Sequence, residues 1–334
     1  MQTKKAINNS TKIVLPLLLG SGILYWMYRD FDFERVKQVM FCEMDWTWML
    51  LSFPFGILAQ AFRGWRWRQL LEPVEERSRA SVRVNAVFLS YALSLVIPRS
   101  GEFARCGVLK RYDGVSFPKS LGTVVTERTI DSLLVLGITG LTLLCQFRVF
   151  DRFFNRTGTR VEIMFDSFSL TGWLVTALCA ASALIMLYVL LRRMSIHNKI
   201  KQTLRGFGQG ILSIRKIRNI PLFVVYTLAI WGCYFLHYYL TFFCFGATSG
   251  LGMACAMVTF IVGSIAVIVP TPNGAGPWHF AVKTMLILYG VANTDALYFV
   301  LIVHAVQTLL VVLLGIYAWL ALAFTKQQTT VGLQ

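Results

Sequence analysis

Charged side chains stand at regular spacings beside the apolar segments of this sequence. Arg128 follows Glu102 by 26 residues, and Asp131 lies three residues further on, so Arg128 and Asp131 share one face of a helix. Ionisable groups within apolar segments are costly to bury and are therefore candidates for function. We predict that Glu102 pairs with Arg128, and that the pair binds a polar headgroup or opens to exchange partners. The alternative is a structural salt bridge between neighbouring segments.

A second set of polar residues repeats this spacing in the C-terminal half. His304 follows His279 by 25 residues, and Gln307 lies three residues further on. Histidine titrates near neutral pH, so protons could drive or gate a movement at these positions. The alternative is a pair of buried neutral histidines that form hydrogen bonds.

Further polar residues flank both sets. Arg99 and Arg105 lie on either side of Glu102 and could hold a phosphate, for which arginine offers bidentate contacts; the alternative is snorkelling at the membrane surface. Lys283 lies one helical turn after His279 and could contact an anionic headgroup. The candidate substrate-binding residues are Arg99, Glu102, Arg105, Arg128, Asp131, Asn273, His279, Lys283, His304 and Gln307.

Two other charged groups receive structural interpretations. Glu127 and Asp131 are expected at the start of a helix over 127–147, where acidic residues favour the helix dipole. Arg63, Arg66 and Trp67 are expected to anchor a helix end at the membrane interface, where such residues are enriched. Lipid loading is the alternative for this group.

The composition is that of a membrane protein. The 334 residues are 56% hydrophobic and only 14% charged, whereas soluble globular proteins carry about 25% charged residues. A membrane span needs about 20 apolar residues. We therefore predict one membrane domain over 1–334, all-α and polytopic, with about six full spans, at 13–28, 46–62, 127–147, 168–191, 220–245 and 296–324.

The net charge of +16 is assigned to basic cytoplasmic loops rather than to nucleic-acid binding. Segment 192–218 carries basic residues and no acidic ones, so we expect a cytoplasmic amphipathic helix on the membrane surface. The seven cysteines lie mostly in apolar runs and are expected to be small core residues rather than metal ligands.

The same charge rule places 63–83 and both termini in the cytoplasm and 29–45 outside. Segment 84–126 must then begin and end inside, and 250–291 outside. Each contains a turn rich in proline and glycine, "PRSGE" at 98–102 and "PTPNGAGPWHF" at 270–280. We predict two re-entrant helical hairpins in an inverted-repeat arrangement, with hairpin-plus-helix repeats at 84–147 and 250–324.

Inverted repeats with broken helices are typical of secondary transporters, whose substrate sites lie near the membrane midplane where the repeats meet. Non-helical backbone at that depth requires burial in protein or a polar cavity. The alternative is that these proline and glycine breaks coincide by chance, with 251–269 spanning the membrane alone.

Four segments carry a family resemblance: "RGWRWRQLL" (63–71), "IPRSGEFARCGVLKRYDG" (97–114), "GTVVTERTID" (122–131) and "PTPNGAGPWHFAVKTMLILYGV" (270–291). Together they resemble the transmembrane region of lysylphosphatidylglycerol synthases and its stand-alone relatives. The resemblance covers roughly 10–325 and implies an inner-membrane protein that moves a polar-headed lipid between leaflets. The family usually has glutamate and arginine where this sequence has His279 and His304, so the second half departs from its pattern.

The synthases add a soluble aminoacyl-transfer domain after this region, and we expect that activity to be absent here. We predict a lipid translocase of the cell inner membrane, multi-pass, with both termini cytoplasmic, whose partner is a membrane phospholipid or glycolipid. A proton-linked mechanism and a homo-oligomer are left open. The alternatives are a membrane enzyme that modifies a lipid headgroup and a non-transporting partner of a lipid synthase. The sequence contains no Walker A pattern and no catalytic motif, and no cofactor is predicted.

Overall fold

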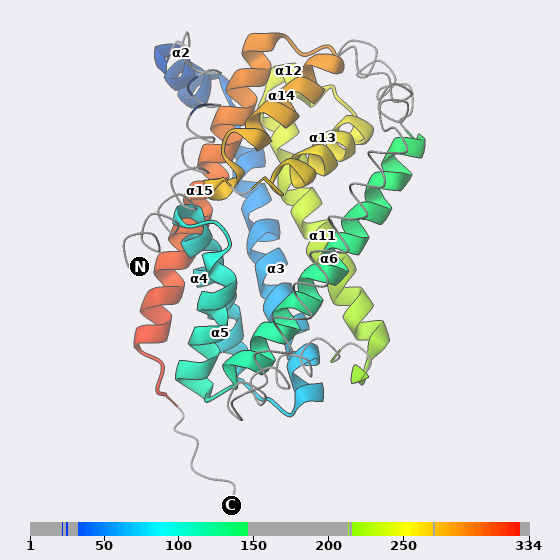
Figure 1. The fold of residues 1–334 in the computed structure, drawn as a ribbon. Helices are drawn as coiled ribbons and strands as arrows, with labels where there is room; N and C mark the ends of the chain where they lie inside the picture. Colours follow the sequence, from blue (N-terminus) through cyan, green and yellow to red (C-terminus); the bar gives the residue numbers. More distant parts are fainter. Residues whose placement is uncertain are drawn as a thin grey trace, which may run out of the picture.

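The computed structural model describes residues 33–145, 216–269 and 271–327, together with Gly22, Tyr25 and Ser213. All regular structure in these residues is helical, in agreement with the predicted fold class (Figure 1). The predicted span at 168–191 lies outside the described residues. The predicted span at 13–28 and the basic segment at 192–218 lie almost entirely outside them.

Four long helices form the body of the protein. They are α3 (Trp46–Leu71), α6 (Phe117–Cys145), α11 (Ile220–Tyr239) and α15 (Asn293–Ala323). Within the described residues, two helical segments are both long and apolar enough to cross a membrane, namely Ile220–Cys244, which includes the 3-10 turn η4 (Leu240–Cys244), and α15. Helices α3 and α6 are 26 and 29 residues long and also reach the length of a span. The predicted number of six spans stays a prediction.

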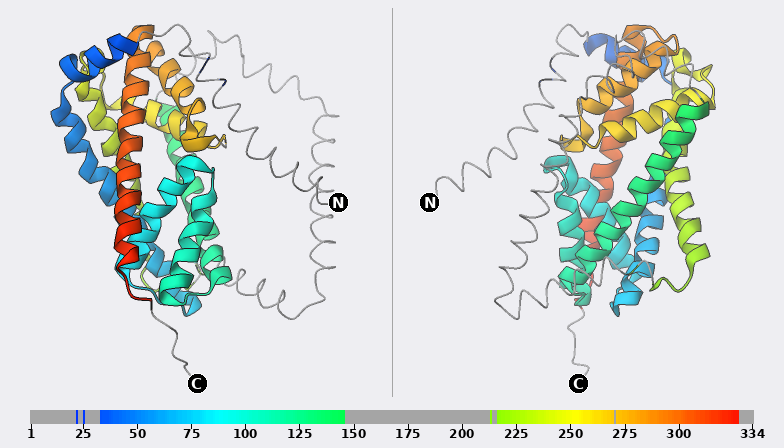
Figure 2. Two further views of the ribbon diagram at one scale, coloured as in Figure 1. Left: turned by 90° about the vertical axis from the view of Figure 1, so that its left-hand side faces the viewer. Right: turned by 45° about the vertical axis from the view of Figure 1, so that its right-hand side comes forward.

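Two helical hairpins lie between the long helices. The first consists of α4 (Ala80–Val96) and α5 (Ser100–Asp113). The second consists of α13 (Met253–Ala266) and α14 (Pro277–Leu288), joined through the 3-10 turn η5 (Pro272–Gly274). The hairpins enter the bundle from opposite ends, and their tips meet about halfway along it (Figures 1 and 2). Helix α4 contacts η5, so the two tips are in direct contact.

Backbone conformation explains how each hairpin turns. Arg99 at the first tip has φ 63° and Asn273 at the second has φ 54°, a region that disfavours most residues but is tolerated by asparagine. Gly276, at φ 91°, precedes α14, and only glycine adopts this conformation without strain. At the base of the first hairpin, the Arg79 Nε donates to Asp113 Oδ1 over 2.7 Å and ties the start of α4 to the end of α5.

Each hairpin packs within its own apolar cluster. One cluster joins α3 to α11, α13, α14 and α15 around Phe242 and Phe299. The other joins the C-terminal half of α3 to α4, α5 and α6 around Trp67 and Leu109. The short elements α2 (Phe33–Gln38), η1 (Val39–Glu43), η2 (Glu72–Val74) and α12 (Gly246–Ser249) complete the described fold.

The predicted start of one long helix is wrong. The sequence suggested a helix over 127–147, but α6 begins at Phe117. Pro118 lies in its first turn, where the missing N–H group has no helical partner to lose. Residues 117–126 therefore belong to the helix rather than to the loop before it.

Because α4 and α5 pack closely, replacing two glycines of α5 by alanine should change the free energy of unfolding by very different amounts. A Cβ atom at Gly101 would lie 1.9 Å from the Ser90 carbonyl oxygen and 2.6 Å from Ser94 Oγ, so α5 must move away from α4. We expect Gly101→Ala to lower the free energy of unfolding by about 1–3 kcal/mol, measured from unfolding curves in detergent micelles. Gly107→Ala on the same helix meets no atom within 4 Å and should be neutral or stabilising. Equal losses in both variants would contradict this packing.

Candidate functional site

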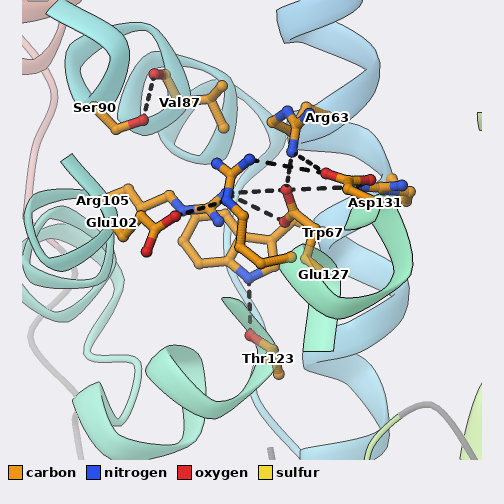
Figure 3. Close-up of polar contacts among 12 residues, drawn as sticks. Arg63, Trp67, Val87, Ser90, Glu102, Arg105, Thr123, Glu127 and Asp131 are labelled. Atoms are coloured by element: carbon orange, nitrogen blue, oxygen red, sulfur yellow. Dashed lines mark hydrogen bonds and ion pairs between the residues drawn. The ribbon is translucent and has the colours of Figure 1, made fainter. Parts of the chain in front are cut away.

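A buried cluster of ion pairs connects α3, α5 and α6 (Figure 3). Arg63 Nη1 lies 2.5 Å from Glu127 Oε1 and 2.7 Å from Asp131 Oδ2. Arg66 Nη2 lies 2.8 Å from Asp131 Oδ1, and Arg105 Nη1 lies 3.2 Å from Glu127 Oε2. The side chains of these five residues are at most 7% exposed. Three guanidinium groups thus converge on two carboxylates away from solvent.

Aromatic rings enclose the arginines of this cluster. The Arg105 guanidinium lies over the Trp67 ring, 4.8 Å from its centroid. Arg63 lies about 6 Å from the rings of Tyr91 and Tyr234, whose hydroxyls are hydrogen bonded to each other at 2.9 Å. Such contacts stabilise a cation that has lost its water.

The predicted Glu102–Arg128 pair lies at the edge of the cluster. Arg128 Nε is 2.7 Å from Glu102 Oε1, and the two side chains are 37% and 32% exposed. Arg128 Nη1 is also 3.8 Å from Asp131 Oδ2, which links this pair to the buried groups. The predicted pairing is present in the structure, whereas its binding role stays a prediction.

Two structural interpretations made from the sequence are wrong. Arg63, Arg66 and Trp67 do not anchor a helix end at an interface, because they are buried and α3 continues to Leu71. Glu127 and Asp131 do not lie at a helix start, since α6 begins at Phe117, and both carboxylates pair with arginines instead. The missed signal was the match between two arginines three residues apart and two acids four residues apart, which places complementary charges on facing helices.

The second hairpin tip carries a neutral polar cluster. The rings of His279 on α14 and His304 on α15 have centroids 4.4 Å apart. His304 Nε2 lies 3.2 Å from the Asn273 carbonyl oxygen, and Asn273 Nδ2 donates to Thr308 Oγ1 over 2.6 Å. The Gly276 N–H donates to His279 Nδ1 over 3.3 Å, which fixes the histidine at the turn.

The last residue of each set contacts a neighbouring long helix. Asp131 on α6 pairs with the arginines of α3. Gln307 on α15 donates through Nε2 to the carbonyl oxygen of His237 on α11, 3.2 Å away. The His237 Nδ1 in turn lies 2.8 Å from the Ser52 carbonyl oxygen of α3. The two halves therefore share a pattern of contacts, charged in the first and neutral in the second.

The structure brings together most of the predicted site residues in these two clusters. Arg105 is 1% exposed and belongs to the ionic cluster, so the alternative of snorkelling at the surface is wrong for it. Arg99 is exposed at the first tip. Lys283 is half-buried on α14, one turn after His279. Among the described residues there is no group of three potential metal ligands.

Comparison with known proteins places the chain in a family. The family model described as the lysylphosphatidylglycerol synthase TM region matches residues 13–315. The chain belongs to this family. The match includes both hairpins, both polar clusters and all four long helices except the end of α15.

One curated relative is glycosyltransferase AglD of Haloferax volcanii. It is 26% identical to this member of the lysylphosphatidylglycerol synthase TM family over 144 residues, which make up 43% of this chain and 23% of AglD. The chain thus aligns with less than a quarter of AglD. No solved structure matches the chain.

The burial of the ionic cluster predicts that Glu127 is essential to the fold. Glu127→Gln leaves three arginines with a single buried carboxylate, and breaking a buried ion pair on one side costs about 3–5 kcal/mol. We expect a loss of this size in the free energy of unfolding, measured in detergent micelles. Glu72→Gln is the matched control, because its pair with Arg68 is exposed and should contribute less than about 1 kcal/mol. Losses of similar size in the two variants would refute the assignment.

Proposed function

We propose that this protein moves a lipid with a polar or anionic headgroup between the leaflets of the cell inner membrane. The observation that carries the proposal is the meeting of two hairpin tips from opposite ends of the bundle, each with a polar pair at an equivalent position. Broken helices that meet in this way form the substrate sites of many secondary transporters. Family membership adds a link to proteins of lipid synthesis.

The distribution of charge supports an orientation for the bundle. The end that holds the base of the first hairpin carries many basic residues on described elements, namely Arg68, Arg77, Arg79, Arg83, Lys110, Arg111, Lys119, Lys216, Arg218 and Lys326. At the opposite end, the charged residues that the structure describes are the acidic Glu34, Glu43, Asp45 and Asp295 and the basic Arg35 and Lys37. By the positive-inside rule the basic end faces the cytoplasm, so the first hairpin enters from inside and the second from outside.

The Glu102–Arg128 pair suggests how a headgroup would enter. It is the accessible part of an otherwise buried ionic cluster. An arriving headgroup phosphate replaces Glu102 as the partner of Arg128, because arginine binds phosphate and carboxylate oxygens with similar geometry. Glu102 is then released to contact a positively charged part of the headgroup, or solvent.

At the second tip, the His279–His304 pair offers neutral hydrogen-bonding groups. These groups bind the polar, uncharged parts of a headgroup without adding charge to the membrane interior. A change in histidine protonation during transport would link lipid movement to a proton gradient.

A second candidate function is the modification of a lipid headgroup. It is favoured by the printed name of the relative AglD, a glycosyltransferase. The candidate groups for such chemistry are Glu102 and Asp131, which are engaged with arginines in the described structure. A catalytic role would require one of these carboxylates to leave its partner.

Exchange of labelled lipids between leaflets of proteoliposomes tests the proposal. The lipid panel holds anionic, zwitterionic and glycosylated species, with and without a pH gradient. We expect wild-type protein to exchange one class of lipid, and Glu102→Gln and His279→Ala each to lower that rate at least tenfold, because each removes one member of a tip pair.

The control is Glu72→Gln, which lies at an exposed pair away from both tips and should exchange at the wild-type rate. Mass spectrometry of the same lipids reports any change of headgroup. Folded protein that exchanges no lipid class would refute translocation, and a modified headgroup would establish the enzyme instead.

A further inference from the structure

The ionic cluster contains more positive than negative charge. Its described members are four arginines, Arg63, Arg66, Arg105 and Arg128, and three carboxylates, Glu102, Glu127 and Asp131. Among these groups one positive charge has no counterpart. An unmatched charge inside a membrane domain is unfavourable, so the described cluster favours the addition of one negative charge.

Among the four arginines, Arg105 has the weakest contacts with carboxylate groups. Its closest carboxylate oxygen is 3.2 Å away, on Glu127, a residue that also pairs with Arg63 and Arg66. The Nε and Nη2 atoms of Arg105 are buried, and no described residue accepts a hydrogen bond from either atom. These two atoms form one edge of the guanidinium plane, the edge that binds two oxygens of a phosphate at once.

The position of this edge is fixed by the surrounding residues. The guanidinium plane lies over Trp67, whose Nε1 donates to Thr123 Oγ1 over 2.9 Å. Arg105 also lies one turn after Glu102 on α5, next to the accessible pair (Figure 3). A ligand that enters at Glu102 therefore reaches Arg105 one helical turn further in.

We propose that the cluster around Arg105 is a binding site for one singly charged phosphodiester, bound through the free Nε and Nη2 edge. A phosphodiester carries one negative charge, which matches the excess of the cluster, and it offers two oxygens in the required geometry. The inference rests on the proposed function and specifies the chemistry that it selects. The phosphodiester belongs to a lipid headgroup or to a free soluble ester, and the experiment separates these sources.

Calorimetric titration of the purified full chain in detergent tests this site. The probes are dimethyl phosphate, short-chain phosphatidylglycerol, and short-chain diacylglycerol, which lacks the phosphate. We expect one phosphodiester per chain and no binding of diacylglycerol. Competition between the two esters shows that they share the site, and tighter binding of phosphatidylglycerol identifies a lipid headgroup as the source. If the wild-type protein binds neither dimethyl phosphate nor phosphatidylglycerol, the proposal is overturned.

Arg105→Lys keeps the charge but removes the two-atom edge, and should weaken phosphodiester binding at least tenfold while the protein stays folded by its melting temperature. Arg111→Lys is the matched control on the same helix, where the arginine is exposed, and should bind within twofold of wild type. Equal affinities in the two variants would overturn the site.

Lipid exchange by the same variants separates this inference from the proposed function. If the protein exchanges lipid but Arg105→Lys binds phosphodiesters as tightly as wild type, the site at Arg105 is refuted and the proposed function is not. If Arg105→Lys weakens phosphodiester binding but the wild-type protein exchanges no lipid, translocation is refuted and the phosphodiester site stands.

Discussion

The carboxylate of Glu127 is the constraint on which the first half of the structure depends. It receives guanidinium groups from both α3 and α5 while being fully buried on α6. A buried charge of this kind is tolerated only with its partners in place, because the loss of one partner leaves another charge in a medium of low polarity. The positions of the three helices are therefore interdependent, and the first hairpin is held by charge as well as by the apolar packing of α4 against α5.

The second half reaches a similar arrangement without charge. Where Glu102 meets Arg128, the equivalent histidines meet as neighbouring rings, and Gln307 takes the place of Asp131 in contacting a long helix. The polar contacts of the two hairpin tips thus differ in electrostatics: ion pairs at the first and hydrogen-bonding rings at the second. In the lipid movement that we propose, the charged tip would select the anionic group and the neutral tip would accommodate the polar remainder.

The sequence predicted the helical membrane fold, the two hairpin segments and the Glu102–Arg128 pairing, because these follow from composition, from proline and glycine turns and from local spacing. It did not predict the environments of Arg63, Arg66 and Glu127. Arginine and tryptophan near the end of an apolar run are typical of a membrane interface, and only the packing of α3 against α6, more than 50 residues away in the chain, reverses that expectation. The start of α6 was missed because Pro118 is equally compatible with a loop and with a first helical turn.

The claim that the two hairpin tips meet within the membrane is tested most directly by measuring the depth of each tip in a bilayer. Ile97 and Ile268 lie at the first and second tips with exposed side chains, so a fluorescent amino acid at either position should be tolerated. Quenching by lipids brominated at defined positions along the acyl chain reports the depth of each label. We expect both labels to lie near the bilayer centre, at similar depths. Labels at opposite headgroup regions would contradict this claim, because the hairpins would then not meet within the membrane.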